Sequence, residues 1–106
     1  MPDFKPYHDQ LPDGWLVSPD DHAEYLAAEL TREIPDRHLL DGVSVSVVAH
    51  RDGTDDILCW HCDDLTRFTV VHLSWLGRTE INSDHPAVEC DGSFDDFLAY
   101  ERGFLA

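Results

Sequence analysis

Apolar and polar residues along this chain recur with two different periods, and the change of period divides it into elements. Between residues 18 and 35 the apolar side chains recur every three or four positions, the spacing of one face of an α-helix. Ser18 and Pro19 suit the start of this helix, because serine can cap the first turn and proline fits the first helical position. Pro35 ends it, because the residue before a proline is disfavoured in helical backbone. The predicted apolar stripe comprises Ala23, Leu26, Ala27, Leu30 and Ile34.

Three segments after this helix have the composition of β-strands. Residues 43–50 alternate with period two, and residues 57–62 follow after a polar loop with a glycine. The third segment, residues 68–75, reads FTVVHLSW and is rich in β-branched and aromatic residues. Because it is apolar at both odd and even positions, we expect it inside a sheet that is covered on both faces. Short polar loops join the three segments, which predicts an antiparallel meander.

Weaker signals flank the meander. Residues 15–17 are predicted to form either a short edge strand or a hydrophobic staple that leads into the first helix, and residues 87–90 a short fourth strand. A turn is expected at Gly77 and a loop at residues 82–86. A second helix is predicted from residue 93 to residue 103, because a serine is followed three residues later by an aspartate, the spacing of a capping box, and a glycine stands at the end.

These elements together predict one α+β domain. It spans residues 1–106, and residues 1–14 form an irregular N-terminal arm because they contain three prolines and a glycine. We expect an antiparallel sheet of three to five strands, with an N-terminal helix and a C-terminal helix packed on one face. That face is predicted to carry Trp60 and Trp75.

The predicted meander also assigns side chains to the two faces of the sheet. If the loops are residues 51–56 and 63–66, the core face collects Val43, Val45, Val47, Ala49, Leu58, Trp60, Cys62, Val71, Leu73 and Trp75. The other face collects all three strand histidines. We predict that it forms a surface for a partner or for a second copy of the chain. The residues of this predicted binding surface are His50, Cys59, His61, Phe68, Val70 and His72.

The net negative charge of the chain limits the kinds of molecule that it can bind. The chain has 7 Lys and Arg and 22 Asp and Glu, a formal net charge of −15. This charge repels nucleic-acid phosphates and anionic lipid, so it disfavours direct nucleic-acid and membrane-surface binding and favours encounter with a basic protein. We see neither a signal peptide nor an apolar run of the roughly 20 residues that span a bilayer. Three cysteines form no disulfide framework, so we expect a cytoplasmic protein.

Candidate chemistry is sparse. Cys59 and Cys62 form a C-x-x-C motif, but residues three apart in a strand point to opposite faces, so we expect structural thiols rather than a metal or redox site. A three-histidine metal site is not predicted, because His50 and His72 are separated by an intervening strand. The sequence lacks the G-x-S-x-G, P-loop and dinucleotide-binding motifs. We therefore assign no catalytic residue, no metal ligand and no cofactor, and an enzyme is not favoured.

One resemblance can be stated at the central segment. Val71-His72-Leu73-Ser74-Trp75-Leu76-Gly77-Arg78-Thr79-Glu80, followed by the acidic helix start Ser93-Phe94-Asp95-Asp96-Phe97, resembles a group of small, functionally uncharacterised bacterial proteins. In that group the strand and turn read VHLTW-S-G-R-x-E. This chain has Ser74 and Leu76 where the pattern has Thr and Ser. The resemblance implies a compact bacterial α+β domain and assigns no functional residue.

Three functions from different classes are compatible with these features. The first is a non-enzymatic acidic binding protein that engages a basic protein, in the manner of an immunity protein that blocks a basic toxin. The second is a small metal-binding or enzymatic domain that uses His50, Cys59, His61 and His72. The third is a nucleic-acid mimic, which the scattered positions of the acids favour less.

Overall fold

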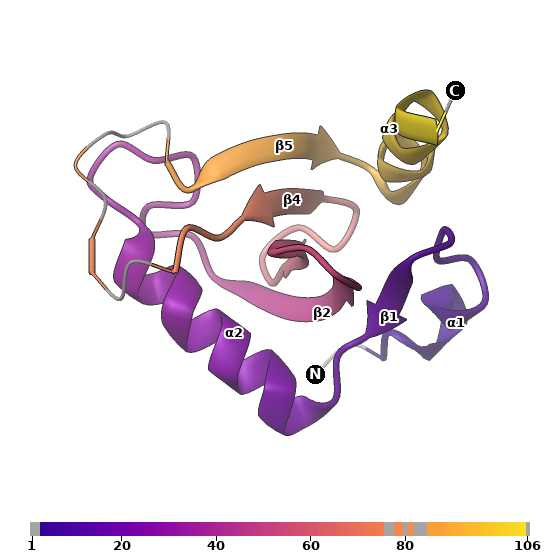
Figure 1. Cartoon of the computed structure of the whole chain (residues 1–106), viewed down its shortest axis with the longest axis horizontal. Coiled ribbons are helices and arrows are strands. Elements are labelled where there is room, and N and C mark those ends of the chain that lie inside the picture. The colour runs from indigo at the N-terminus through magenta and orange to yellow at the C-terminus, as the bar shows by residue number, and fades with distance from the viewer. Residues whose placement is uncertain (1–2, 76–77, 80, 82–84, 106) are drawn as a thin grey trace.

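The computed structural model describes residues 3–75, 78–79, 81 and 85–105. Its centre is an antiparallel sheet of five strands, each paired with its neighbours in the sequence (Figure 1). The strands are β1 (Trp15–Val17), β2 (Val45–Arg51), β3 (Asp56–His61), β4 (Phe68–His72) and β5 (Ala87–Gly92). The helix α2 (Asp20–Glu33) lies between β1 and β2 in the chain, and α3 (Phe94–Leu105) follows β5. The predicted α+β class, the meander and both flanking strands are confirmed.

The N-terminal arm contains a short helix, α1 (Lys5–His8), which the sequence did not predict. Pro6 stands in its first turn, where a missing backbone N–H costs little. The arm is held by aromatic contacts: Phe4 lies 5.7 Å from the Trp60 ring, and Tyr7 lies 5.6 Å from the Phe68 ring. These contacts fix the arm against the sheet.

The two longer helices begin differently. At α3 the predicted capping box is present, because Ser93 N donates to Asp96 Oδ2 at 2.9 Å and Asp96 N donates to Ser93 Oγ at 3.1 Å. At α2 the N-cap residue is Pro19, and Ser18 makes no cap because its hydroxyl contacts His50 Nδ1 at 2.8 Å. The prediction that Gly103 ends the second helix is wrong, since α3 continues to Leu105.

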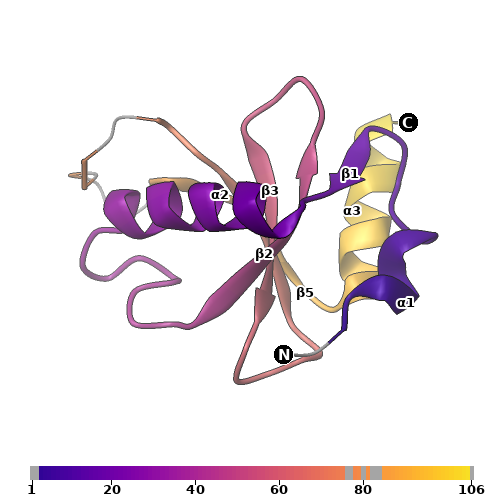
Figure 2. The same ribbon diagram turned by 90° about the horizontal axis from the view of Figure 1, so that it is seen from below.

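The helices cover opposite faces of the sheet, which corrects the expectation that both pack on one face (Figure 2). Leu26 and Leu30 of α2 pack in a cluster with residues of β2, β3 and β4, as well as Leu40 and Leu73. Phe94 and Phe97 of α3 pack in a second cluster with Trp60 and the N-terminal arm. A sheet with apolar side chains on both faces needs a cover on each, and one helix covers each face.

The strand registers explain the error. We expected Cys59 opposite Val70, whereas Leu58 lies opposite Val70 and Cys59 opposite Thr69. Side chains alternate between the faces of a strand, so a shift of one residue moves every side chain of β4 to the other face relative to β3. A second shift occurs in β2, where a bulge at Val48 separates the paired residues Val47 and Ala49.

The end of the central segment also differs from its prediction. Trp75 was placed in the core, yet it lies beyond β4 with a φ of 58° and 38% of its surface exposed. Its ring stacks on Tyr25 at 5.6 Å, and its Nε1 donates to Asp55 Oδ1 at 2.8 Å. The expected turn at Gly77 and most of the expected loop, residues 82–84, lie outside the described residues. Among the described residues, no helix is both long and apolar enough to cross a bilayer.

Candidate functional site

The predicted binding surface does not form one exposed face. Cys59 is buried under α2, whereas Phe68 and Val70 are buried on the α3 side. These three side chains are core residues, so a homodimer through this face would have to displace a helix. Burial also raises the pKa of the Cys59 thiol to about 12, which keeps it protonated and unreactive at neutral pH.

The three strand histidines are separated. His61 shares a side of β3 with Cys59, and His50 is paired with Ile57, so both belong to the α2 side. His72 lies opposite Asp56 and belongs to the α3 side. The three strand histidines therefore form no common site. A metal-binding or enzymatic site made of His50, Cys59, His61 and His72 is not supported by this geometry.

His50 and His61 are each tied to a neighbour. His50 lies with its ring 4.6 Å from His22 of α2, and its pKa is lowered by burial and then by His22. His61 Nε2 lies 2.7 Å from Thr69 Oγ1, which in turn donates to Asp91 Oδ1 at 2.8 Å. Because the Thr69 hydroxyl donates its hydrogen to Asp91, His61 Nε2 must be the donor in the hydrogen bond to Thr69 Oγ1. Burial lowers the pKa of His61 as well, followed by the effect of Arg67.

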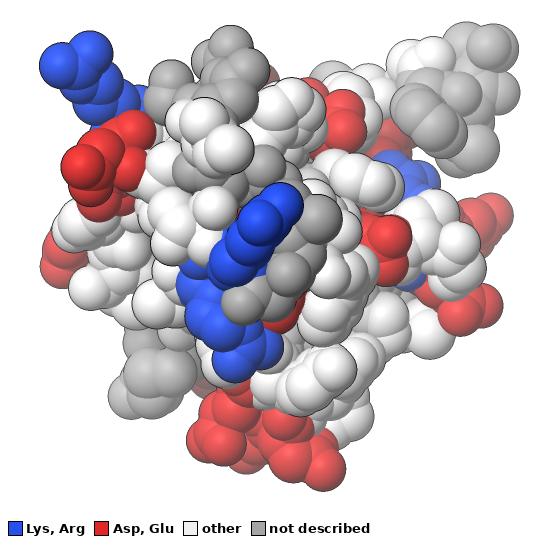
Figure 3. All heavy atoms as spheres, turned by 60° about the vertical axis from the view of Figure 1, so that its left-hand side comes forward, with Lys and Arg blue, Asp and Glu red and all other residues white. Residues whose placement is uncertain are grey.

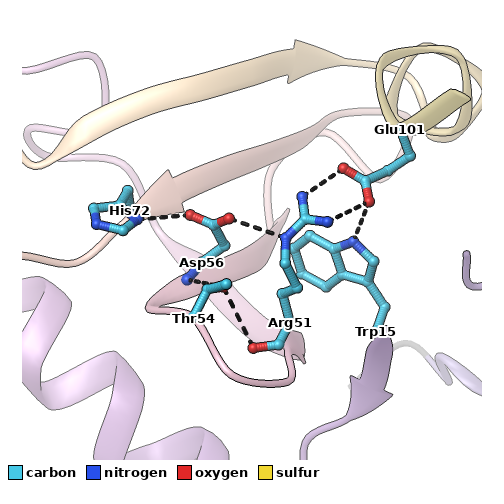
Figure 4. A network of polar contacts seen from close by, with 6 residues as sticks. All are labelled: Trp15, Arg51, Thr54, Asp56, His72 and Glu101. Atoms are coloured by element: carbon cyan, nitrogen blue, oxygen red, sulfur yellow. Dashed lines mark hydrogen bonds and ion pairs between the residues drawn. The ribbon is translucent and has the colours of Figure 1, made fainter. Parts of the chain in front are cut away.

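A polar network that we did not predict crosses the other side of the sheet (Figure 4). Glu101 of α3 accepts from both terminal nitrogens of Arg51, at 2.8 and 2.6 Å, and from Trp15 Nε1 at 2.7 Å. The Arg51 guanidinium also lies 5.0 Å from the Trp15 ring centroid. Its Nε donates to Asp56 Oδ2 at 3.0 Å, and Asp56 Oδ1 lies 2.8 Å from His72 Nδ1. The network ends in the pair of the mostly buried Asp56 and the half-exposed His72.

The sequence does contain a signal for this network. Glu101 stands four residues after Phe97 and seven after Phe94, so it lies on the buried stripe of α3. Glu29 and Glu33 interrupt the buried stripe of α2 in the same way. An acid in the apolar stripe of a helix needs a buried partner, because an unpaired buried charge is costly. The helical spacing therefore indicated that such an acid has a buried partner, but it did not identify the partner residue.

Glu33 performs a structural role at the end of β4. Its carboxylate accepts from the backbone N–H groups of Ser74 and Trp75, each at 2.8 Å, and from the Ser74 hydroxyl at 2.9 Å. Burial and then the hydrogen bond with Glu29 raise its pKa, while the Ser74 and Trp75 donors oppose this. The three hydrogen bonds hold the backbone where Trp75 adopts its positive φ.

A groove lies beside β2 in the described part of the chain. It has a volume of about 730 Å³ and lies between α1, the first turns of α2 and the strands β2 and β3. Its wall is largely apolar, with Val17, Ala23, Val45, Val47 and Trp60 among the lining residues. This combination of a strand edge and apolar walls is typical of sites for extended polypeptide.

The groove runs along a part of β2 that, on one side, is not paired with any strand of the described chain. Within the described residues, β1 pairs with Ala49, His50 and Arg51 of β2, and no strand pairs with Val45–Val47 on that side. Asp3, Asp20 and Glu24 are among the residues that line the groove, together with Lys5. The lining thus has more acidic than basic side chains, and an open strand edge can accept another strand.

We compared the chain with protein-family models, with curated proteins and with solved structures, and none of them matches it.

Proposed function

We propose that this protein is a non-enzymatic acidic binding protein that holds an extended, basic segment of a partner protein in the groove along β2. The observation that carries the proposal is the coincidence of a strand edge that no described strand pairs with, a largely apolar cavity of about 730 Å³ and three acidic lining residues. An added strand would form backbone hydrogen bonds with Val45–Val47 and would place alternate side chains in the cavity.

Charge supports a basic occupant rather than a second copy of the chain. Two copies would each bring a net charge of −15 to the contact, whereas a lysine- or arginine-rich segment would be attracted to it. The acidic surface is uneven: in Figure 3 a short band of Lys and Arg side chains crosses the middle of the face, and Asp and Glu side chains lie below and around it. Binding of a basic segment should therefore depend on the charges beside the groove and not only on the net charge of the protein.

An immunity protein that neutralises a basic toxin in the bacterial cytoplasm is the form of this function that we favour. We infer a bacterial origin from the resemblance of the central segment and a cytoplasmic location from the cysteine content. Cys59, Cys62 and Cys90 are all free thiols in the structure. Such an inhibitor needs no catalytic residue, since blocking the toxin surface suffices.

A pair of synthetic peptides tests the proposal by isothermal titration calorimetry at low salt. We expect a decapeptide of alternating valine and lysine to bind with one-to-one stoichiometry, and its valine–glutamate counterpart not to bind. Glu24→Lys should weaken binding about fivefold, since an exposed charge pair is worth up to about 1 kcal/mol. Asp36→Lys makes the same charge change at an exposed residue outside the groove lining and serves as the control.

The control decides between specific and general attraction. If Glu24→Lys and Asp36→Lys weaken binding equally, the peptide is attracted by net charge and the groove proposal fails. If neither peptide binds and sedimentation shows a dimer that increases with concentration, the strand edge is instead paired by a second copy.

A further inference from the structure

Three potential metal ligands from neighbouring strands meet on the α3 side of the sheet. They are Asp56 of β3, His72 of β4 and Glu89 of β5, and one ligand atom of each lies within 4.8 Å of the others. Carboxylate oxygen and imidazole nitrogen are ligands of Zn²⁺ and related divalent ions. This cluster does not overlap the groove lining, so it is independent of the proposed binding function.

The strand register explains how the three side chains come together. Asp56 lies opposite His72, and His72 lies opposite Ala87. In β5 the register shifts between the pairs Val70–Cys90 and Val71–Val88, which leaves Glu89 as the extra residue of a β-bulge. Bulges redirect side chains and are frequent beside functional sites. Here the bulged Glu89 lies next to the Asp56–His72 pair.

The surroundings orient one ligand in advance. Asp56 Oδ2 accepts from Arg51 Nε at 3.0 Å, and Arg51 is itself held by two hydrogen bonds from its terminal nitrogens to Glu101. The backbone N–H of Asp56 donates to Thr54 Oγ1 at 3.2 Å. Hydrogen bonds from outside the ligand set that fix a ligand carboxylate are a regular feature of metal centres. Asp56 therefore presents its Oδ1 to the cluster in a fixed direction.

We propose that Asp56, His72 and Glu89 bind one divalent transition-metal ion of the zinc class. A tetrahedral site with bonds of 2.0–2.1 Å has ligand atoms about 3.3 Å apart, so the exposed Glu89 side chain must rotate inward. Three protein ligands leave a fourth position for water. Mg²⁺ and Ca²⁺ are expected to bind more weakly, because both prefer an all-oxygen set of six or more ligands.

Acidic side chains outnumber basic ones around the cluster. Burial raises the pKa of Tyr100, and Glu89, Asp56 and Glu101 raise it further, whereas Arg51 lowers it. The half-exposed His72 ring gives an ion access from solvent. The net charge of −15 further concentrates cations at the surface.

Calorimetric titration of the metal-free protein with Zn²⁺ tests the site, and Mg²⁺ serves as the comparison ion. We expect one equivalent of Zn²⁺ to bind and to raise the melting temperature, and Mg²⁺ to do neither. Glu89→Gln and His72→Gln should each weaken Zn²⁺ binding at least tenfold. The matched controls Asp36→Asn and His8→Gln remove a carboxylate and an imidazole elsewhere, and both variants should bind Zn²⁺ as the parent protein does.

Glu89→Gln keeps the test decisive, because Glu89 is exposed and this change conserves its shape. Its melting temperature without metal should equal that of the parent protein, so that lost binding is not lost folding. The proposal is overturned if the parent protein binds no Zn²⁺ equivalent. It is also overturned if all four variants bind equally, which would mean adventitious binding by the other histidines and acids.

Discussion

Glu101 is an acidic residue with 1% of its surface exposed, held between Trp15 and Arg51. The Arg51 guanidinium donates to both carboxylate oxygens of Glu101, and Asp56 accepts from its Nε–H. Bidentate pairing of this kind fixes two side chains in one geometry. The pair ties α3 to the end of β2 and at the same time holds Asp56 for His72. Removing either partner would leave the other as an unpaired buried charge, and this cost determines how much the pair matters for stability.

Glu101→Gln should lower the free energy of unfolding by about 3 kcal/mol, because it leaves the largely buried Arg51 with a weaker partner. Urea denaturation at neutral pH measures the change. Arg67→Gln is the control, since its pair with Asp91 is partly exposed and should cost at most about 1 kcal/mol. Equal losses in the two variants would show that burial does not set the strength of these pairs.

At the scale of elements, each face of the sheet depends on its own helix. The α2 cluster contains Leu30 against Val71 and Leu73, and the α3 cluster contains Phe97 among Leu58, Trp60 and Val70. Trp75 belongs to neither cluster. It is attached at the surface by its contacts with Tyr25 and Asp55. Loss of the helix contacts on either face should therefore lower the free energy of unfolding strongly, independently of the other face.

Leu30→Ala and Phe97→Ala should each destabilise the fold by about 3–4 kcal/mol, because each opens a cavity in a different core cluster. Trp75→Ala should cost about 1–2 kcal/mol, since the ring is partly exposed and loses mainly one stacking contact and one hydrogen bond. Unfolding free energies from urea titration provide the measurement. A loss at Trp75 as large as that at Phe97 would contradict the surface position of the tryptophan.

At the scale of the whole molecule, buried titratable groups make stability depend on pH. The pKa values of His50 and His61 are lowered from 6.5, in each case mainly by burial. The unfolded chain therefore binds more protons than the folded chain just below pH 6.5, and folding weakens as the pH falls through that range. The raised pKa of Glu33 acts in the opposite sense, because its contribution is present at low pH and is lost as the pH rises through its folded pKa.

The urea midpoint of the parent protein should fall when the pH is lowered from 7.5 to 5.5, and the fall should be smaller in a His50→Gln, His61→Gln double variant. The reason is that the variant removes the two groups whose protonation favours the unfolded chain. Comparing the differences between the two pH values cancels any constant cost of the substitutions. The same fall in both proteins would rule out these histidines as the source.

The sequence determined which elements exist, because helix and strand periods, caps and turn residues are local properties. This is why α2, the meander and the capping box at Ser93 could be predicted. Tertiary structure decided which faces meet: one residue of register in the second hairpin and one bulge at Val48 moved the central side chains to the other face. Only the structure identified Arg51 as the partner of Glu101 and brought Glu89 to His72, since these pairs lie far apart in the sequence. Strand register and long-range side-chain contacts depend on how the whole fold packs, and a local sequence pattern carries no information about this packing.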